Sequence, residues 1–202
     1  MSCVLLTGFG PFGKYKENSS WAVAEKVAAL GVDGLEVVQL PVSFAGVAAV
    51  LREAVTKHNP NVLVMLGQAA GIDYIKLERI AINMMDSQTA DNDGYIPDEE
   101  PICPGGEAAL FTNTNIKELR SAVEEQGIPV KVSNCAGLYV CNRLYYEALR
   151  LCGERPGVKA LFVHLPFYEG QPSATEGKPT MPLTDMVKYV ETIICKIQQW
   201  QK

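Results

Sequence analysis

A cysteine close to the start of a predicted helix is the strongest candidate nucleophile in the chain. The segment VKVSNCAGLYVCNRLYYEALRL is typical of a strand, a tight turn at Ala136-Gly137 and a helix over residues 138–152, which places Cys141 in or near the first helical turn. The positive end of the helix dipole favours the reactive thiolate there, and the free amides can stabilise an oxyanion. A buried structural cysteine is the alternative. Cys135, before the turn, and Cys152, at the helix C-terminus, are weaker candidates.

A thiol nucleophile needs a base, and the chain contains only two histidines. His164 follows an apolar run and is expected at the carboxyl end of a strand, whereas His58 is expected at an exposed helix end beside Asn59-Pro60. His164 is therefore the candidate base. A histidine packed in the core is the alternative.

Glu78 is a charged residue inside the apolar strand pattern YIKLERIAIN. Alternation along a strand points Arg79 to the opposite face, so the two residues do not pair directly. A buried carboxylate needs a partner, and a histidine N–H would be one. Glu78 is therefore the candidate to orient His164, and a solvated position on an edge strand is the alternative.

The elements that must position these residues follow from short apolar runs that alternate with helical patterns. This alternation predicts one α/β domain over residues 1–202, with three α/β/α layers and a largely parallel, twisted sheet. Strands are expected at residues 3–8, 35–40, 61–66, 74–83, 130–133 and 159–165, and helices at 21–30, 44–58, 115–127, 138–152 and 183–200. Two polar stretches, 84–112 and 168–182, are expected to be loops that cover a site. Open α/β sheets bind ligands at the carboxyl ends of their strands, where the candidate residues converge.

The segment VLLTGFGPFG contains, in residues 8–13, the G-x-G-x-x-G spacing of a dinucleotide-binding turn. In such a turn the helix begins within the glycines and an acidic residue ends the second strand. Here residues 14–17 precede any helical pattern, and the second strand ends in Val38-Gln39-Leu40. No cofactor is therefore expected. The turn is interpreted either as a tight loop that leaves a strand or as a loop that holds Phe9 and Phe12 against a small apolar pocket.

Composition argues against several classes of partner. The formal net charge is -5 and no basic stripe is present, so nucleic acid is not an expected partner. No run of about 18 apolar residues and no secretory leader is visible, so we expect no membrane partner and a cytoplasmic location. The six cysteines form no C-x-x-C pair, so no metal site is expected.

Five motifs together resemble the pyroglutamyl peptidase I family, also called pyrrolidone carboxyl peptidase. They are, in chain order, GFGPFG with NSSW, GQAAG, ERIAIN, AGLYVCN and FVH, and the resemblance extends over nearly the whole chain. Members of this family are cytosolic cysteine peptidases that remove an N-terminal 5-oxoproline residue with a Cys-His-Glu triad. The resemblance implies these roles for Cys141, His164 and Glu78, the same residues that their chemistry singles out.

The resemblance also implies a substrate-binding site. Phe12, together with Phe9, matches the aromatic wall of the lactam pocket, and Gln68, Tyr139 and Val140 match positions that line that pocket or the oxyanion region. Such a pocket suits a small, flat, uncharged lactam, which can stack on a ring while polar groups bind its N–H and carbonyl.

The chain departs from the family pattern near these motifs. Lys76 stands where the family usually has Ser or Thr, and Ile72 where many bacterial members have Arg. Ser87-Gln88 occupies a region in which many members carry an Arg near the oxyanion, and Cys135 replaces a small polar residue or Ala. No triad residue is lost, so activity is expected, with Gln88 weakening oxyanion stabilisation.

We therefore expect a cysteine exopeptidase that forms an acyl-enzyme with N-terminally pyroglutamylated peptides. By resemblance, it is expected to form a homo-oligomer such as a tetramer. A catalytically weak relative that only binds pyroglutamyl or lactam compounds is the alternative, and a nucleotide-dependent enzyme is a more distant one.

Overall fold

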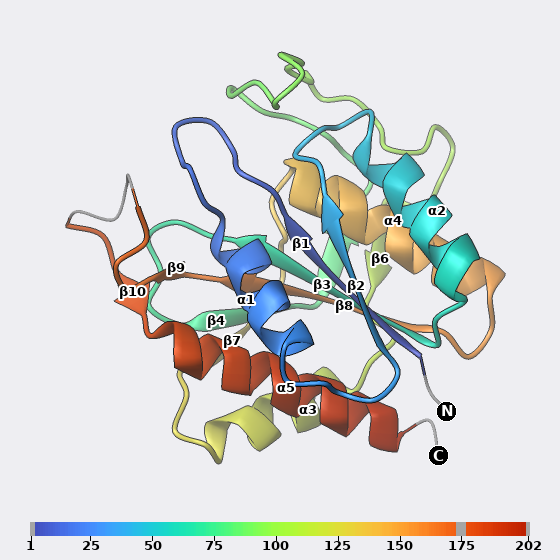
Figure 1. Cartoon of the computed structure of the whole chain (residues 1–202). Helices are drawn as coiled ribbons and strands as arrows, with labels where there is room; N and C mark the ends of the chain where they lie inside the picture. The colour runs from blue at the N-terminus through green and yellow to red at the C-terminus, as the bar shows by residue number, and fades with distance from the viewer. Residues whose placement is uncertain (1–2, 173–176, 201–202) are drawn as a thin grey trace.

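Six strands form the central sheet of the computed structural model, which describes residues 3–172 and 177–200. Their order across the sheet is β2-β1-β3-β8-β4-β7 (Figure 1). Four of them run parallel to one another, β4 is antiparallel to β8, and β7 is parallel to β4. The strands are β1 (Val4–Phe9), β2 (Leu35–Leu40), β3 (Val62–Gln68), β4 (Ile75–Glu78), β7 (Val130–Ser133) and β8 (Lys159–Leu165). The predicted, largely parallel sheet is thus confirmed.

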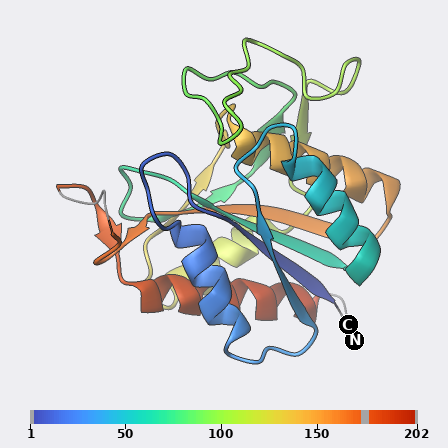
Figure 2. The same ribbon diagram turned by 45° about the horizontal axis from the view of Figure 1, so that its top comes forward.

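Helices cover both faces of this sheet, which gives the predicted three layers (Figures 1 and 2). On one face lie α1 (Ser19–Ala28), α3 (Ile116–Glu124) and α5 (Leu183–Gln199), and on the other lie α2 (Val47–His58) and α4 (Val140–Glu154). Each face has its own hydrophobic core, because alternate residues of every central strand point to opposite sides. Both cores share one sheet, which supports the single domain over residues 1–202; that assignment stays a prediction.

Local signals in the sequence determine where several helices begin and end. Asn18 caps α1 by accepting a hydrogen bond from the Ser20 N–H, and Asn115 caps α3 by accepting one from the Glu118 N–H. The helix α2 ends at Asn59, which adopts a left-handed conformation with φ 44° directly before Pro60.

The strand expected over residues 74–83 is two strands, and this prediction is wrong at Arg79. The Arg79 N–H donates to the Ser133 carbonyl, but its own carbonyl accepts a hydrogen bond from the Thr112 N–H. The chain therefore leaves the main sheet after Glu78 and continues as β5 (Ile80–Ile82), which pairs with the antiparallel strand β6 (Ala109–Phe111). Alternating apolar residues do not reveal such a change of partner, because both strands have the same period.

The two polar stretches contain more order than the sequence predicted. The loop between β5 and β6 rises above α4 (Figure 2) and is braced by the Asn83 side chain, which bonds to both backbone polar groups of Cys103. The second stretch contains the short parallel pair β9 (Phe167–Tyr168) and β10 (Thr180–Met181), while its residues 173–176 lie outside the described residues. Within the described chain, no helix is both long and apolar enough to cross a membrane.

Candidate active site

Cys141 is the second residue of α4, so its thiol lies in the first turn of that helix. The first turn contains no acidic residue, and no side chain caps it. Its amide groups and the positive end of the helix dipole are therefore not neutralised locally. Gly67 at the end of β3 lies directly against the thiol, since a Cβ atom there would be 3.1 Å from the Cys141 Sγ and 2.8 Å from Phe162 Cζ. A glycine is thus needed for the thiol to approach the sheet this closely.

His164, near the carboxyl end of β8, links Cys141 to Glu78. Its Nδ1 lies 2.8 Å from Glu78 Oε1, and the Cys141 side chain is close enough to the ring to raise its pKa. Burial by itself lowers the pKa of His164, but the interactions with Cys141 and Glu78 outweigh burial and raise the pKa from 6.5 to about 9. The imidazole is therefore held in the protonated form beside the sulfur at neutral pH.

Glu78 is fully buried, so the alternative of a solvated position on an edge strand is wrong. β4 lies between β8 and β7, and its antiparallel register with β8 places Glu78 opposite Phe162 and Lys76 opposite His164. These residues share one face of the sheet, so the carboxylate reaches the imidazole from the neighbouring strand. Its second oxygen, Oε2, has no hydrogen-bond partner among the described residues. A buried carboxylate of this kind depends on the imidazolium for its stability.

A small pocket of about 120 Å³ opens beside the thiol. It contains all five residues expected to bind substrate, and two that the sequence analysis did not select. The lining residues are Phe9, Phe12, Asn18, Val42, Gln68, Tyr139, Val140 and Cys141. Asn18 was recognisable as a helix cap but not as a pocket residue, while Val42 carries no sequence signal beyond being apolar.

The aromatic wall of this pocket is held in place by the loop above α4. The Tyr139 hydroxyl donates to the Ala90 carbonyl at 2.9 Å, and its ring centre lies 5.4 Å from that of Phe12 and 5.1 Å from that of Phe44. Burial raises the pKa of Tyr139 to about 12, with further contributions from the charges of Asp91 and Cys141. The neutral ring therefore presents an apolar surface to a ligand.

Gln68 provides a polar side of the pocket. Its Oε1 accepts hydrogen bonds from the Ser19 backbone N–H and from Gln171 Nε2, both at 2.8 Å. These bonds fix the side-chain amide at the end of β3, where it can donate to a bound carbonyl group.

The weaker candidates of the sequence analysis lie elsewhere. Cys135 is exposed on the connection from β7 to α4, and Cys152 is buried near the far end of α4, where burial raises its pKa to about 11. His58 Nδ1 lies 3.2 Å from Glu36 on the surface. Among residues 3–172 and 177–200, no group of three His, Cys, Asp or Glu side chains is arranged to hold a metal ion.

The dinucleotide-binding interpretation of the glycine turn has no support in the geometry. Nine residues, 10–18, separate the end of β1 from the start of α1, so the helix N-terminus is not part of the turn. Gly8 instead lets β1 contact α1, because a Cβ atom there would lie 2.6 Å from the Ser20 carbonyl oxygen.

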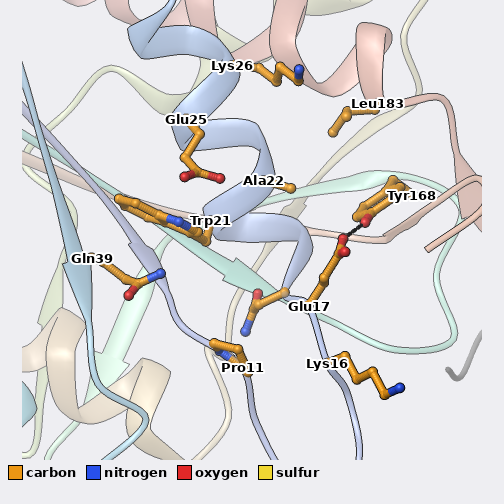
Figure 3. Close-up of a pocket in the computed structure, with 11 residues that line it drawn as sticks. Pro11, Lys16, Glu17, Trp21, Ala22, Glu25, Lys26, Gln39, Tyr168 and Leu183 are labelled. Atoms are coloured by element: carbon orange, nitrogen blue, oxygen red, sulfur yellow. Dashed lines mark hydrogen bonds between the residues drawn. The ribbon is translucent and has the colours of Figure 1, made fainter. Parts of the chain in front are cut away.

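A second, larger pocket of about 440 Å³ shares Asn18 with the first in its lining (Figure 3). Trp21 and Glu25 of α1 point into it, and the Tyr168 hydroxyl donates to the Glu17 carboxylate at its rim. It contains no thiol and no histidine, so it cannot supply a cysteine nucleophile with a histidine base.

The fold and the site together define an α/β protein that has the side chains of a thiol hydrolase beside a pocket for a small, flat ligand. Comparison with known proteins is consistent with this class. A sequence model of the family described as "Pyroglutamyl peptidase" matches residues 2–199, and the chain belongs to that family.

Relatives named pyrrolidone-carboxylate peptidase match over nearly their whole length. The pyrrolidone-carboxylate peptidase of Thermococcus onnurineus is 40% identical over 95% of this chain and 96% of its own, and that of Escherichia fergusonii is 39% identical over 96% and 92%. The crystal structure of the pyrrolidone carboxyl peptidase from Fervidobacterium islandicum superposes with a TM-score of 0.92 at 35% identity, covering 98% of this chain and 99% of that one. The structure of pyroglutamyl peptidase I from Bacillus amyloliquefaciens superposes with a TM-score of 0.87 at 36% sequence identity, covering 95% of this chain and 94% of that one.

Proposed function

We propose that the chain removes an N-terminal pyroglutamyl residue from peptides and that Cys141, His164 and Glu78 carry out the reaction. Family membership supports the pyroglutamyl-removing peptidase activity. The observation that supports the residue roles is the hydrogen bond between the imidazole and the buried carboxylate, with the Cys141 thiol close enough to raise the pKa of the same ring and beside a pocket of suitable size.

In the first step the Cys141 thiolate attacks the carbonyl carbon of the pyroglutamyl residue while the lactam ring occupies the pocket. A carbon–sulfur bond forms, and the negative charge that develops on the carbonyl oxygen is stabilised by backbone N–H groups at the start of α4. His164 donates its proton to the nitrogen of the departing peptide as the carbon–nitrogen bond breaks.

In the second step water hydrolyses the resulting thioester. His164, now neutral, removes a proton from the water molecule, the oxygen bonds to the acyl carbon, and pyroglutamate leaves as the thiolate is restored. Glu78 orients the imidazole and stabilises its positive charge in both steps.

The pocket residues supply the specificity for a lactam. Phe12 and Tyr139 offer ring faces to the flat lactam, and Phe9, Val140 and Val42 close its apolar sides. Gln68 binds a lactam polar group. Apart from the Cys141 thiolate, whose charge is balanced by His164, the pocket contains no charged side chain, so an N-terminal proline with its positively charged ring nitrogen is disfavoured by the cost of desolvation.

Release of aminomethylcoumarin from pyroglutamyl-aminomethylcoumarin tests this proposal, with prolyl-aminomethylcoumarin as the matched substrate that lacks the lactam carbonyl. We expect cleavage of the first only, and its loss when iodoacetamide modifies one thiol that peptide mapping locates at Cys141. Cleavage that persists after complete alkylation of Cys141 would contradict the thiol mechanism.

The alternative of a protein that only binds lactams has little support in the site. Gln88 is exposed, and within the described residues neither Gln88 nor Lys76 lines the pocket. A homo-oligomer such as a tetramer and a cytoplasmic location remain predictions, and sedimentation equilibrium of the reduced protein tests the first.

A further inference from the structure

Four residues form a row across the sheet on the face that carries the thiol. Strand pairing places Gly67 of β3 opposite His164 of β8, His164 opposite Lys76 of β4, and Lys76 opposite Lys131 of β7. Their strand neighbours Leu66, Leu165, Leu77 and Val130 belong to the core on the other face, so all four residues of the row point to the Cys141 side. Adjacent members are separated by about 5 Å, the usual distance between strands.

This row indicates how a bound substrate lies across the sheet, from the lactam pocket towards β7. The lactam pocket is built from the β1, β2 and β3 side, with Phe9, Val42 and Gln68 among its lining. The thiol lies over Gly67, and the base that protonates the departing nitrogen is His164 on the next strand. The peptide released in the reaction must therefore extend past His164, over β4 and β7, where Lys76 and Lys131 lie.

The positive charges of these two lysines are not compensated locally. Neither Lys76 nor Lys131 makes an ion pair in the described part of the chain; the Lys131 ammonium instead lies 3.9 Å from the centre of the Tyr74 ring. Glu78 shares the face of β4 with Lys76, but its Oε1 is hydrogen-bonded to His164 and forms no ion pair with Lys76. The connection over residues 134–139, from β7 to α4, contains no acidic residue.

Exposure also fits a role in binding. Lys76 is half-buried and Lys131 is exposed, so the ammonium groups are accessible but Lys76 is partly shielded from water. Partial burial strengthens its attraction for an anion compared with a fully solvated lysine.

We propose, resting on the peptidase activity above, that Lys76, assisted by Lys131, binds a carboxylate located immediately after the scissile bond. In a pyroglutamyl dipeptide the terminal carboxylate follows the scissile nitrogen after a single carbon atom, which is within reach of a lysine on the strand beside His164. An acidic side chain on the residue after pyroglutamate offers the same group. Lys76 is thus a specificity residue for the leaving peptide and takes no part in bond breaking.

Two matched pairs of substrates test the proposal. Pyroglutamyl-alanine and pyroglutamyl-alanine amide differ only in the terminal carboxylate, while the amides of pyroglutamyl-glutamate and pyroglutamyl-glutamine differ only in the side-chain carboxylate. We expect kcat/KM to favour the carboxylate by about tenfold in at least one pair at low ionic strength, and salt to reduce that ratio. The pair that shows the preference identifies which carboxylate is bound.

Variants then assign the preference to Lys76. In Lys76→Gln the ratio of kcat/KM between the two substrates of the pair should fall to about one, and Lys76→Arg should retain part of the preference. This ratio does not respond to changes that affect both substrates equally. Lys188→Gln, an exposed lysine of α5 on the far side of the molecule, should leave the ratio unchanged. The proposal is overturned if neither pair shows a preference in the wild-type protein or if the preference survives in Lys76→Gln. Failure of the peptidase assignment itself would differ, because the wild-type protein would then cleave no pyroglutamyl substrate, and this proposal would fail with it.

Discussion

The two ends of α4 place the same residue type in opposite environments. Cys141 lies in the first turn, against Gly67 and beside His164, and it lines a pocket. Cys152 lies near the last turn, is 8% exposed, and packs among apolar side chains of the core. Burial there raises the pKa of the Cys152 thiol to about 11, so it stays protonated at neutral pH.

The difference indicates that position along a helix, and not burial, is what would make a cysteine reactive. The N-terminal end of α4 offers free amides, a positive dipole and a histidine partner. The C-terminal end has the negative end of the dipole, and burial of Cys152 outweighs the charges of Lys159 and Arg155. A change at the N-terminal end of α4, or at its partners, can therefore be compared with a matched change near or beyond the other end of the helix.

Replacing the thiol itself should have the largest effect. We expect Cys141→Ala to lower kcat/KM for pyroglutamyl-aminomethylcoumarin by about 10⁴-fold or more, because the nucleophile is lost. Cys152→Ala should change kcat/KM by less than about threefold and should instead lower the free energy of unfolding by about 1 kcal/mol, since it leaves a small cavity. Equal losses of activity in the two variants would remove the distinction between the two ends.

Removing the charge of Glu78 should have the next largest effect. Glu78→Gln preserves shape but no longer stabilises the imidazolium, so we expect a loss of about 10²-fold or more in kcat and a lower pKa for His164. His164 must be protonated to assist the leaving nitrogen, so the wild-type activity should fall as the pH rises through about 9, and this fall should begin at lower pH in Glu78→Gln.

A buried carboxylate in the middle of α4 provides the control for that experiment. Glu147 bonds to Arg52 at 2.8 Å and to Arg150 at 3.2 Å. Glu147→Gln should lower the melting temperature but leave the alkaline limit of the pH profile of kcat where it is in the wild-type protein. An unchanged profile in Glu78→Gln would argue against its role in holding the imidazolium.

Adding a methyl group under the thiol should have a smaller effect. In Gly67→Ala the new Cβ would lie 2.8 Å from Phe162 Cζ and 3.1 Å from the Cys141 Sγ, so both groups must shift. We expect a loss of about 1–3 kcal/mol in stability and a clear fall in the rate of alkylation of Cys141 by iodoacetamide.

Gly153→Ala places the same methyl group at the other end of α4. A Cβ there meets nothing within 4 Å, so this variant should be as stable as the wild-type protein or more stable by about 0.5–1 kcal/mol. Its Cys141 should react with iodoacetamide at the wild-type rate.

Loosening the attachment of the helix start should have the smallest effect on catalysis. The Asn142 side chain ties α4 to β5 by accepting from the Ile82 N–H at 2.9 Å and donating to the Ile82 and Met84 carbonyls at 2.8 and 2.9 Å. Asn142→Ala should cost about 1–3 kcal/mol of stability and lower kcat by about tenfold, measured by chemical denaturation and by the coumarin assay. Arg155→Ala, just beyond the other end of α4, should change the free energy of unfolding by no more than about 0.5 kcal/mol and kcat by no more than about twofold.

The sequence by itself determined most of the local structure and the candidate residues. The strands at residues 35–40, 130–133 and 159–165 were predicted with the observed bounds, because each is a short apolar or alternating run between clear turns. The position of Cys141 in the first turn of a helix followed from the glycine turn before it and the apolar period after it. These features depend on neighbouring residues, so their signal is local.

Only the tertiary structure decided which of these residues meet. Glu78 reaches His164 because β4 runs antiparallel to β8, and the switch of the chain at Arg79 from one sheet to another leaves no trace in the alternation. Asn18 and Val42 join the pocket, and Lys76 joins the row beside His164, through contacts between segments far apart in the chain. Strand order and direction are set by how all the apolar faces pack together, and no single segment of the sequence contains that information.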